Sequence, residues 1–315
     1  MRNHTMVTEF ILLGIPETKG LETVLFFLFS SLYLCTLLGN VLILTTILSS
    51  PLLHSPMYFF LGNLSVFDMG FSSTTAPKML LYLSGPNQII SFQGCVSQLF
   101  FYHFLGCTEC FLYTVMAYDR FVAICKPLRY MVIMNYRVCS VLAIVTWVGG
   151  CVHAIILTSL IFQLPYCGSN EVRYYFCDIP AVLLLACEDT SLVQRVGFTN
   201  VGLLSLVCFF LILVSYTRIG ISISKIHSAK GRHRALSTCS AHITAIFCAY
   251  GPVIIIYLQP NPSPMLGAIM QILNNLVAPM LNPLIYSLRN KDVKLALRNI
   301  FSKRNFALEK KIRKP

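Results

Sequence analysis

Seven long apolar stretches constrain this chain most, because each is close to the roughly 20 residues that a helix needs to cross a membrane. Charged residues make up 11% of the 315 residues, whereas roughly 25% are charged in a typical soluble protein. We therefore expect an all-α membrane protein with a bundle of seven transmembrane helices. The expected spans are 23–48, 57–83, 93–125, 138–164, 194–219, 236–258 and 266–288.

Turn residues separate these stretches, for example Ser49-Ser50-Pro51 and Ser84-Gly85-Pro86-Asn87. A sustained two-residue alternation is missing from the sequence, which disfavours a β-barrel. The expected organisation is a tail over residues 1–22, one helical bundle over 23–301 and a basic tail over 302–315. Four charged residues interrupt the first twenty, so we expect the first span, rather than a cleaved signal peptide, to direct insertion.

The positive charge is distributed unevenly along the chain. Of 24 Lys and Arg residues, 19 fall on one side of the seven predicted spans. Positive residues favour the cytoplasmic side, so the N-terminus is expected outside and the C-terminus inside. The net charge of +12 is therefore explained by the orientation of the chain in the membrane and by contact of its basic residues with anionic lipid. A nucleic acid partner is not expected.

Four of the cysteines lie on the outer side, and four cysteines allow three pairings that sequence alone leaves open. They are Cys95, Cys167, Cys177 and Cys187. Asn3-His4-Thr5 is a glycosylation acceptor on the same side. Metal ligation by the four cysteines is the alternative to disulfides, but Tyr174-Tyr175-Phe176-Cys177-Asp178 contains no His, so a metal site is not expected there.

Two acids, Asp68 and Glu109, lie deep in the apolar pattern, where a carboxylate must be neutralised or paired. A third acid, Asp119, precedes Arg120 at the cytoplasmic end of the third span. An ionic pair at that position indicates a function. A catalytic nucleophile, base and orienting group do not recur at useful spacing, so an enzyme is not expected.

Five segments, in this order, are typical of one family. They read PMYFFLGNLSVFD (56–68), MAYDRFVAICKPL (116–128), SY (215–216), RALSTCSAH (234–242) and PMLNPLIYSLRN (279–290). The chain resembles odorant (olfactory) receptors, a branch of the rhodopsin-like (class A) G-protein-coupled receptors. The resemblance covers almost the whole chain. Phe121 replaces the Tyr usual after the Asp-Arg pair, and Arg234 replaces a usual Lys, but both keep the physical character.

The resemblance implies a receptor for small, mostly hydrophobic volatiles that activates the olfactory stimulatory G protein and raises cyclic AMP. It also implies a plasma-membrane location in olfactory neuron cilia, and the disulfides Cys95–Cys177 and Cys167–Cys187. The alternatives are a class A receptor for a non-odour metabolite or peptide, and an ion-coupled transporter. Opsin-type retinal binding is excluded, since residues 266–288 contain no Lys. Amine binding is disfavoured, because residues 93–108 contain no acid.

Site residues follow from helical spacing and from the resemblance. Asp68 and Glu109 match an internal cation pocket, near Asn40 and Asn282, which holds either a sodium ion or a shared proton; no other cofactor is expected. The switch is expected to hold Arg120 on Asp119 at rest and to release it toward Tyr216 and Tyr286, with Pro283 beside Asn282 as a hinge. The expected ligand site comprises Tyr102, His103, Gly106, Cys107, Cys110, His153, Asn200, Leu204, Tyr250, Val253, Ile254, Tyr257 and Asn275. Gly106 is expected to leave room beside Tyr250. A short amphipathic helix is expected after Arg289, with Val293, Leu297, Ile300 and Phe301 on one face.

Overall fold

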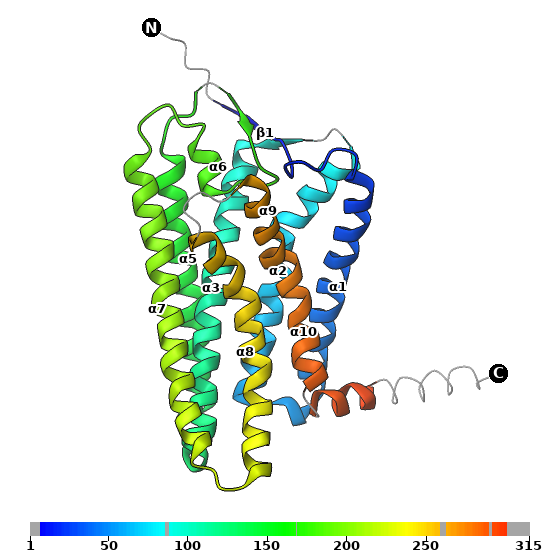
Figure 1. The fold of residues 1–315 in the computed structure, drawn as a ribbon, viewed down its shortest axis with the longest axis vertical. Helices are drawn as coiled ribbons and strands as arrows, with labels where there is room; N and C mark the ends of the chain where they lie inside the picture. The colour runs from blue at the N-terminus through cyan, green and yellow to red at the C-terminus, as the bar shows by residue number, and fades with distance from the viewer. Residues whose placement is uncertain (1–6, 86–87, 168, 259–262, 290–291, 301–315) are drawn as a thin grey trace, which may run out of the picture.

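A bundle of long helices, closed at its outer end by a small sheet, makes up the molecule in the computed structural model (Figure 1). Residues 7–85, 88–167, 169–258, 263–289 and 292–300 are described. The long helices are α1 (Glu22–Ser49), α2 (Pro56–Ser84), α3 (Phe92–Cys125), α5 (Tyr136–Phe162), α7 (Ser191–Ser224) and α8 (Ala229–Leu258). The seventh crossing is built from α9 (Pro264–Ile272), the π-helical η3 (Leu273–Val277) and α10 (Ala278–Arg289).

Among the described residues, six of these crossings are long and apolar enough to span a membrane by length and composition. The remaining crossing, α2, has 29 residues but carries Asp68 and a run of Ser and Thr. Its polar residues are largely turned inward: Ser65, Asp68, Ser72 and Thr75 are all buried. The expected seven-helix bundle is therefore present, with α2 as its most polar member.

The bundle is apolar outside and polar inside, the reverse of a soluble protein. Large apolar side chains such as Phe27, Leu206 and Phe247 are more than 60% exposed, and in a membrane this surface contacts lipid. Polar side chains such as Asn40 and Asn282 are at most 2% exposed. Buried polar groups require hydrogen-bond partners, so the interior polar residues fix how the helices meet.

Local sequence explains where several helices begin. Ser91 Oγ accepts a hydrogen bond from Gly94 N at 3.0 Å and caps α3. Asn135 Oδ1 caps α5 through Val138 N at 3.0 Å. Ser263 Oγ caps α9 through Leu266 N at 3.2 Å, and Pro56 occupies the first turn of α2. These residue types satisfy backbone N–H groups that lack helical partners.

Short elements complete the chain. Three of them lie on the cytoplasmic side: the 3₁₀ turns η1 (Pro51–Leu53) and η2 (Pro127–Arg129), and α4 (Tyr130–Ile133). A single turn of helix, α6 (Ile179–Leu183), lies in the outer loop. Residues 292–300 form a further helix, with Val293 and Ala296 only 1% exposed. It follows α10 and runs sideways from the lower end of that helix (Figure 1), as expected for an amphipathic helix on the inner leaflet.

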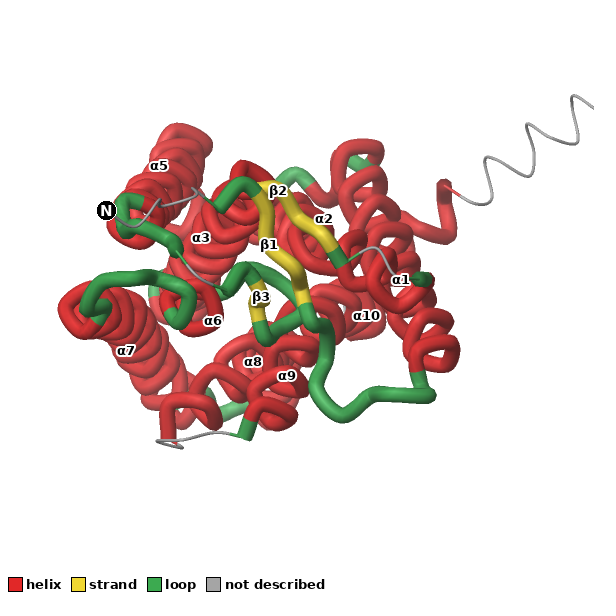
Figure 2. The backbone as a smooth tube through the Cα atoms, turned by 90° about the horizontal axis from the view of Figure 1, so that it is seen from above, coloured by secondary structure: helices red, strands yellow, loops and turns green. Residues whose placement is uncertain are grey.

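A three-stranded sheet covers the outer end of the bundle (Figure 2). Its order is β2 (Ile89–Ser91), β1 (Glu9–Leu12), β3 (Glu171–Val172). The central strand β1 pairs antiparallel with β2 and parallel with β3. Phe10 and Leu12 are at most 1% exposed, so this part of the predicted outer tail is packed onto the bundle.

Candidate functional site

A buried polar chain connects α2, α3 and α10 in the middle of the bundle. Asn282 Nδ2 donates to both carboxylate oxygens of Asp68, at 3.1 and 3.0 Å, and lies 3.2 Å from the hydroxyl of Tyr113. That hydroxyl donates to Glu109 Oε1 at 3.0 Å. The structure thus brings together three of the residues predicted for the cation pocket, and Tyr113, which the prediction omitted, links them.

Asn40, the fourth residue expected there, binds the backbone of the seventh crossing instead. Pro283 has no N–H, so the carbonyl of Pro279, four residues earlier, has no donor within its own helix. Asn40 Nδ2 lies 3.1 Å from that carbonyl oxygen and donates to it. Thr36 Oγ1 approaches the Leu276 carbonyl in η3 at 3.4 Å. Helix α1 thereby supplies a donor to the carbonyl that Pro283 leaves without one, and makes a second polar contact with the seventh crossing.

The outer half of the bundle contains buried polar atoms with no hydrogen-bond partner among the described residues. They include His103 Nε2 on α3 and Thr158 Oγ1 on α5. The buried Tyr250 hydroxyl on α8 lies beside the Cys110 thiol. The rings of His103 and His153 lie 6.3 Å apart. Cys107 and Cys110 lie close to Cys208 of α7, which the prediction missed, and Tyr250 packs on Phe209. Most of the predicted ligand residues on these helices therefore gather in one region, with Asn200 and Leu204 on the neighbouring part of α7, both half-buried.

A second outer group forms under the loop that follows α5. Tyr102 OH donates to Gln271 Oε1 of α9 at 2.7 Å, and its ring lies 5.1 Å from Phe176. Asn275 is 1% exposed, and its side chain lies close to the buried hydroxyl of Tyr175. Tyr175, Phe176 and Gln271 were missed, although the position of the two aromatics next to Cys177 could have indicated them.

Some predicted ligand residues lie elsewhere. Gly106 was expected to leave room beside Tyr250, but a Cβ at this position would meet the Phe71 ring of α2 at 3.4 Å. Gly106 therefore faces α2, and the room expected beside Tyr250 stays a prediction. Ile254 is 38% exposed, since it lies on the face of α8 that is turned away from the bundle, whereas Val253 is half-buried. The side chain of Tyr257 falls outside the described residues.

Two disulfides hold the outer loop. Cys95 at the start of α3 is joined to Cys177, and Cys167 to Cys187, with Cα–Cα distances of 5.5 and 5.7 Å. Beside the first, Asp178 caps α6 by accepting a hydrogen bond from Ile179 N at 2.8 Å. Burial raises the pKa of Asp178 to about 6, against the lowering effect of that hydrogen bond. The disulfide that ties the loop to α3 is thus next to a titratable group, Asp178. Asn3 lies outside the described residues, so its glycosylation stays a prediction.

The cytoplasmic switch differs from the expected resting arrangement. Asp119 Oδ1 accepts a hydrogen bond from Tyr130 OH of α4 at 2.8 Å. In the described part of the chain, no ion pair or hydrogen bond joins Asp119 to Arg120. The expected ionic pair is therefore absent from this conformation, although Arg120 is close enough to Asp119 to interact with it electrostatically.

Arg120 is instead 7% exposed and turned into the bundle. It is close enough to Tyr216, His242 and Tyr286 to interact electrostatically with each. Tyr216 OH lies 2.7 Å from His242 Nδ1, a partner that the prediction did not include. The structure thus brings Arg120 to the two tyrosines toward which the switch was expected to release it.

Comparisons with known proteins identify the family of the chain. A family model described as olfactory receptor matches residues 29–304. A human protein that bears the name olfactory receptor 10D4 is 82% identical over 294 residues, which are 93% of this chain and 99% of that protein. Human and mouse olfactory receptor 10D3 are 70% and 69% identical over 300 residues, 95% of this chain and 96% of each relative.

Family membership favours an odorant-binding, G-protein-coupled receptor over the transporter and over receptors for other ligands, and it excludes an enzyme. The six apolar helices and the match agree on a multi-pass membrane protein. The chain therefore belongs to the olfactory receptor family and is an odorant receptor of the class A G-protein-coupled type.

Proposed function

We propose that this receptor binds a small, mostly hydrophobic volatile in the outer half of the bundle, between α3, α5, α7 and α8. The observation that supports this site is a pair of buried polar atoms, His103 Nε2 and Thr158 Oγ1, that have no hydrogen-bond partner among the described residues. Leaving such atoms unpaired costs roughly 1–3 kcal/mol each, and a ligand that hydrogen-bonds to them recovers part of that cost.

The chemistry of the lining narrows the ligand. Thiols, aromatic rings and aliphatic side chains predominate, and the polar groups are hydroxyl, imidazole and amide. A neutral molecule with one or two oxygen atoms on a hydrocarbon skeleton matches this combination of apolar surface and few polar groups. An aldehyde, ketone, ester or alcohol offers an acceptor for Tyr250 OH.

For signalling, we propose coupling to the olfactory stimulatory G protein, with a rise in cyclic AMP in olfactory neuron cilia. Arg120, Tyr216 and Tyr286 form the moving part, with Pro283 beside Asn282 as the hinge of the seventh crossing. Exposed basic residues at the inner end, such as Lys126 and Arg232, favour contact with anionic lipid at the plasma membrane.

We also propose that Asp68 and Glu109 hold a sodium ion or share a proton in the resting receptor. Besides the two carboxylates, the buried Oδ1 atoms of Asn40 and Asn282 lack hydrogen-bond partners among the described residues. Oxygen donors of this kind suit a hard cation. Sodium chloride should raise the thermal midpoint of the unliganded receptor relative to choline chloride, and Asp68→Asn should remove that difference. A pH-dependent midpoint without sodium dependence would favour the proton.

A cyclic AMP assay tests the ligand site directly. Cells expressing the receptor with the olfactory G protein are screened against volatiles that differ in functional group. Tyr250→Phe and Thr158→Ala should change potency by different factors for different agonists, because each removes one polar contact. Tyr136→Phe, which alters a tyrosine 81% exposed near the cytoplasmic end of α5, serves as the matched control. Equal losses for every agonist at normal surface expression would contradict the site.

A further inference from the structure

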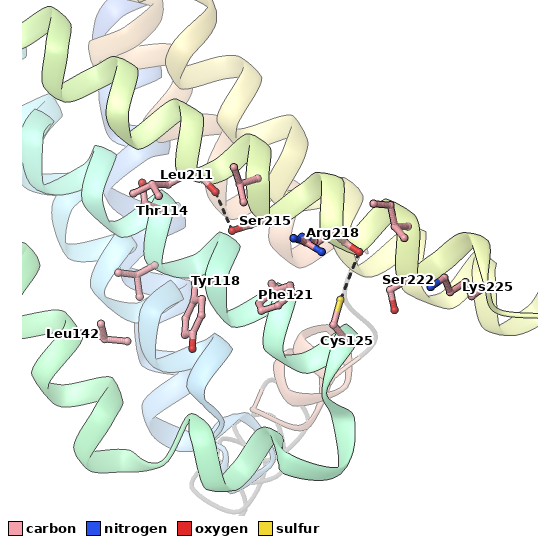
Figure 3. A pocket seen from close by; sticks show the side chains of 13 residues that line it. Thr114, Tyr118, Phe121, Cys125, Leu142, Leu211, Ser215, Arg218, Ser222 and Lys225 are labelled. Atoms are coloured by element: carbon pink, nitrogen blue, oxygen red, sulfur yellow. Dashed lines mark hydrogen bonds between the residues drawn. The ribbon is translucent and has the colours of Figure 1, made fainter.

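A groove on the membrane-facing side of α3, α5 and α7 is not used by the odorant site or by the switch. Its volume is about 740 Å³, and its described lining contains none of the residues predicted to bind ligand. α7 contributes Leu211, Val214, Arg218, Ile221 and Lys225. Their spacing of three and four residues places them on one face of the helix. Figure 3 shows this face turned toward α3, with Arg218 near Phe121.

The groove changes character along its length. From Leu211 to Lys225 it follows α7 for about 21 Å at 1.5 Å per residue. Half of a hydrocarbon core of about 30 Å is about 15 Å, so the groove reaches from near the middle of the bilayer to the inner headgroups. Its upper part, with Leu142, Leu211 and Val214, is apolar, and its lower part has Arg218, Ser222 and Lys225.

The charge at the lower end has one sign. Arg218 and Lys225 are both exposed, and the lining includes no Asp or Glu. A third cation lies beside them, because Lys126 Nζ is 5.9 Å from the centre of the Phe121 ring. The backbone of α7 contacts α3 without using these charges, since Cys125 Sγ lies 3.7 Å from the Arg218 carbonyl oxygen.

We infer that this groove binds an anionic phospholipid of the inner leaflet, with an acyl chain along Leu211 and Val214 and the headgroup phosphate between Arg218 and Lys225. The apolar upper part and its opening toward the hydrocarbon favour a lipid over a soluble anion. Long basic side chains reach the headgroup level from within the bilayer. The site is separate from the odorant site, which lies in the outer half of the bundle.

Native mass spectrometry of the purified full-length receptor tests this assignment. The receptor is titrated with phosphatidylserine and with phosphatidylcholine that carry the same acyl chains. Each basic residue near anionic lipid contributes roughly 1 kcal/mol. Arg218→Gln or Lys225→Gln should therefore weaken phosphatidylserine binding about fivefold, and the double variant about thirtyfold. Phosphatidylcholine binding should not change, which also reports that the variants are folded.

Two further variants separate the groove from general surface charge. Arg137→Gln combined with Arg232→Gln removes two exposed cytoplasmic cations that do not line the groove, and should leave phosphatidylserine binding within twofold. Val214→Trp fills the apolar part and should weaken both lipids. Equal binding of the two lipids, or the same loss in the control pair, would overturn the inference. Displacement of the bound lipid by glycerophosphoserine alone would also overturn it, by assigning a soluble anion site instead.

Discussion

The contact between Asn40 and the Pro279 carbonyl makes the packing of α1 on the seventh crossing testable. Asn40 Nδ2 lies 2.9 Å from the Thr36 carbonyl and 3.1 Å from that of Pro279. The first acceptor lies in the regular part of α1, where the backbone already supplies a donor. The second lacks a helical donor because residue 283 is proline. Asn40→Ala therefore orphans one buried carbonyl.

The size of this effect follows from the environment. A buried acceptor without a partner costs roughly 1–3 kcal/mol, whereas interhelical hydrogen bonds in membrane bundles average about 0.6 kcal/mol. We expect Asn40→Ala to destabilise the receptor by about 1 kcal/mol, which lowers its thermal midpoint by roughly 2–4 °C. In a Pro283→Ala background, the new N–H satisfies the Pro279 carbonyl, and the cost of Asn40→Ala should fall toward zero.

Thermal unfolding of the four proteins in this cycle, purified in detergent, measures the coupling energy directly. Thr45→Ala is the control, because Thr45 Oγ1 is exposed and hydrogen-bonds only within α1, to Val41 and Leu42. Its effect should stay within about 0.5 kcal/mol. Equal destabilisation by Asn40→Ala in both backgrounds would show that Asn40 does not act through Pro279.

Three further predictions concern the switch and the outer loop. Arg120→Ala should abolish the cyclic AMP response while surface expression persists, and a full response would refute the switch assignment. Tyr130→Phe frees the Asp119 carboxylate to pair with Arg120, so basal cyclic AMP should fall; a rise would contradict this role. The folded-state pKa of Asp178 is raised to about 6 from 3.8, so the unfolded chain ionises first and stability is lost as pH rises from about 4 to 6. Asp178→Asn, which keeps the α6 cap, should stabilise the receptor at pH 7.5 by at most about 3 kcal/mol and change little at pH 4; equal midpoint shifts at both pH values would argue against it.

Sequence reasoning located the spans well because the thickness of the hydrocarbon core and the rise per residue of a helix together fix the length of each span. The expected span 57–83 is α2 (Pro56–Ser84), and 23–48 is α1 (Glu22–Ser49). Ends that continue beyond the membrane were less predictable. α7 extends to Ser224, five residues past the expected end at 219, because hydropathy marks where lipid ends and not where the helix ends.

The features that were missed depend on contacts between distant segments. β1, β2 and β3 have two to four residues each, too few for an alternation pattern, and β1 and β3 are far apart in sequence. The direction of Gly106 toward Phe71 depends on how α3 is rotated against α2, which spacing along one helix cannot fix. Tyr130 lies eleven residues after Asp119, and only the turn through η2 brings its hydroxyl to the carboxylate.

The central position of β1 has a consequence for biosynthesis. Glu9 is translated early, yet its carbonyl accepts a hydrogen bond from Asn170, which is 161 residues later. At about 5–20 residues per second, the strand waits on the order of 10–30 s, while four helices enter the membrane, before its parallel neighbour exists. The first segment to reach the outside therefore finds its parallel neighbour only after four of the seven crossings have been made, and removing it would leave β2 and β3 without the strand that joins them.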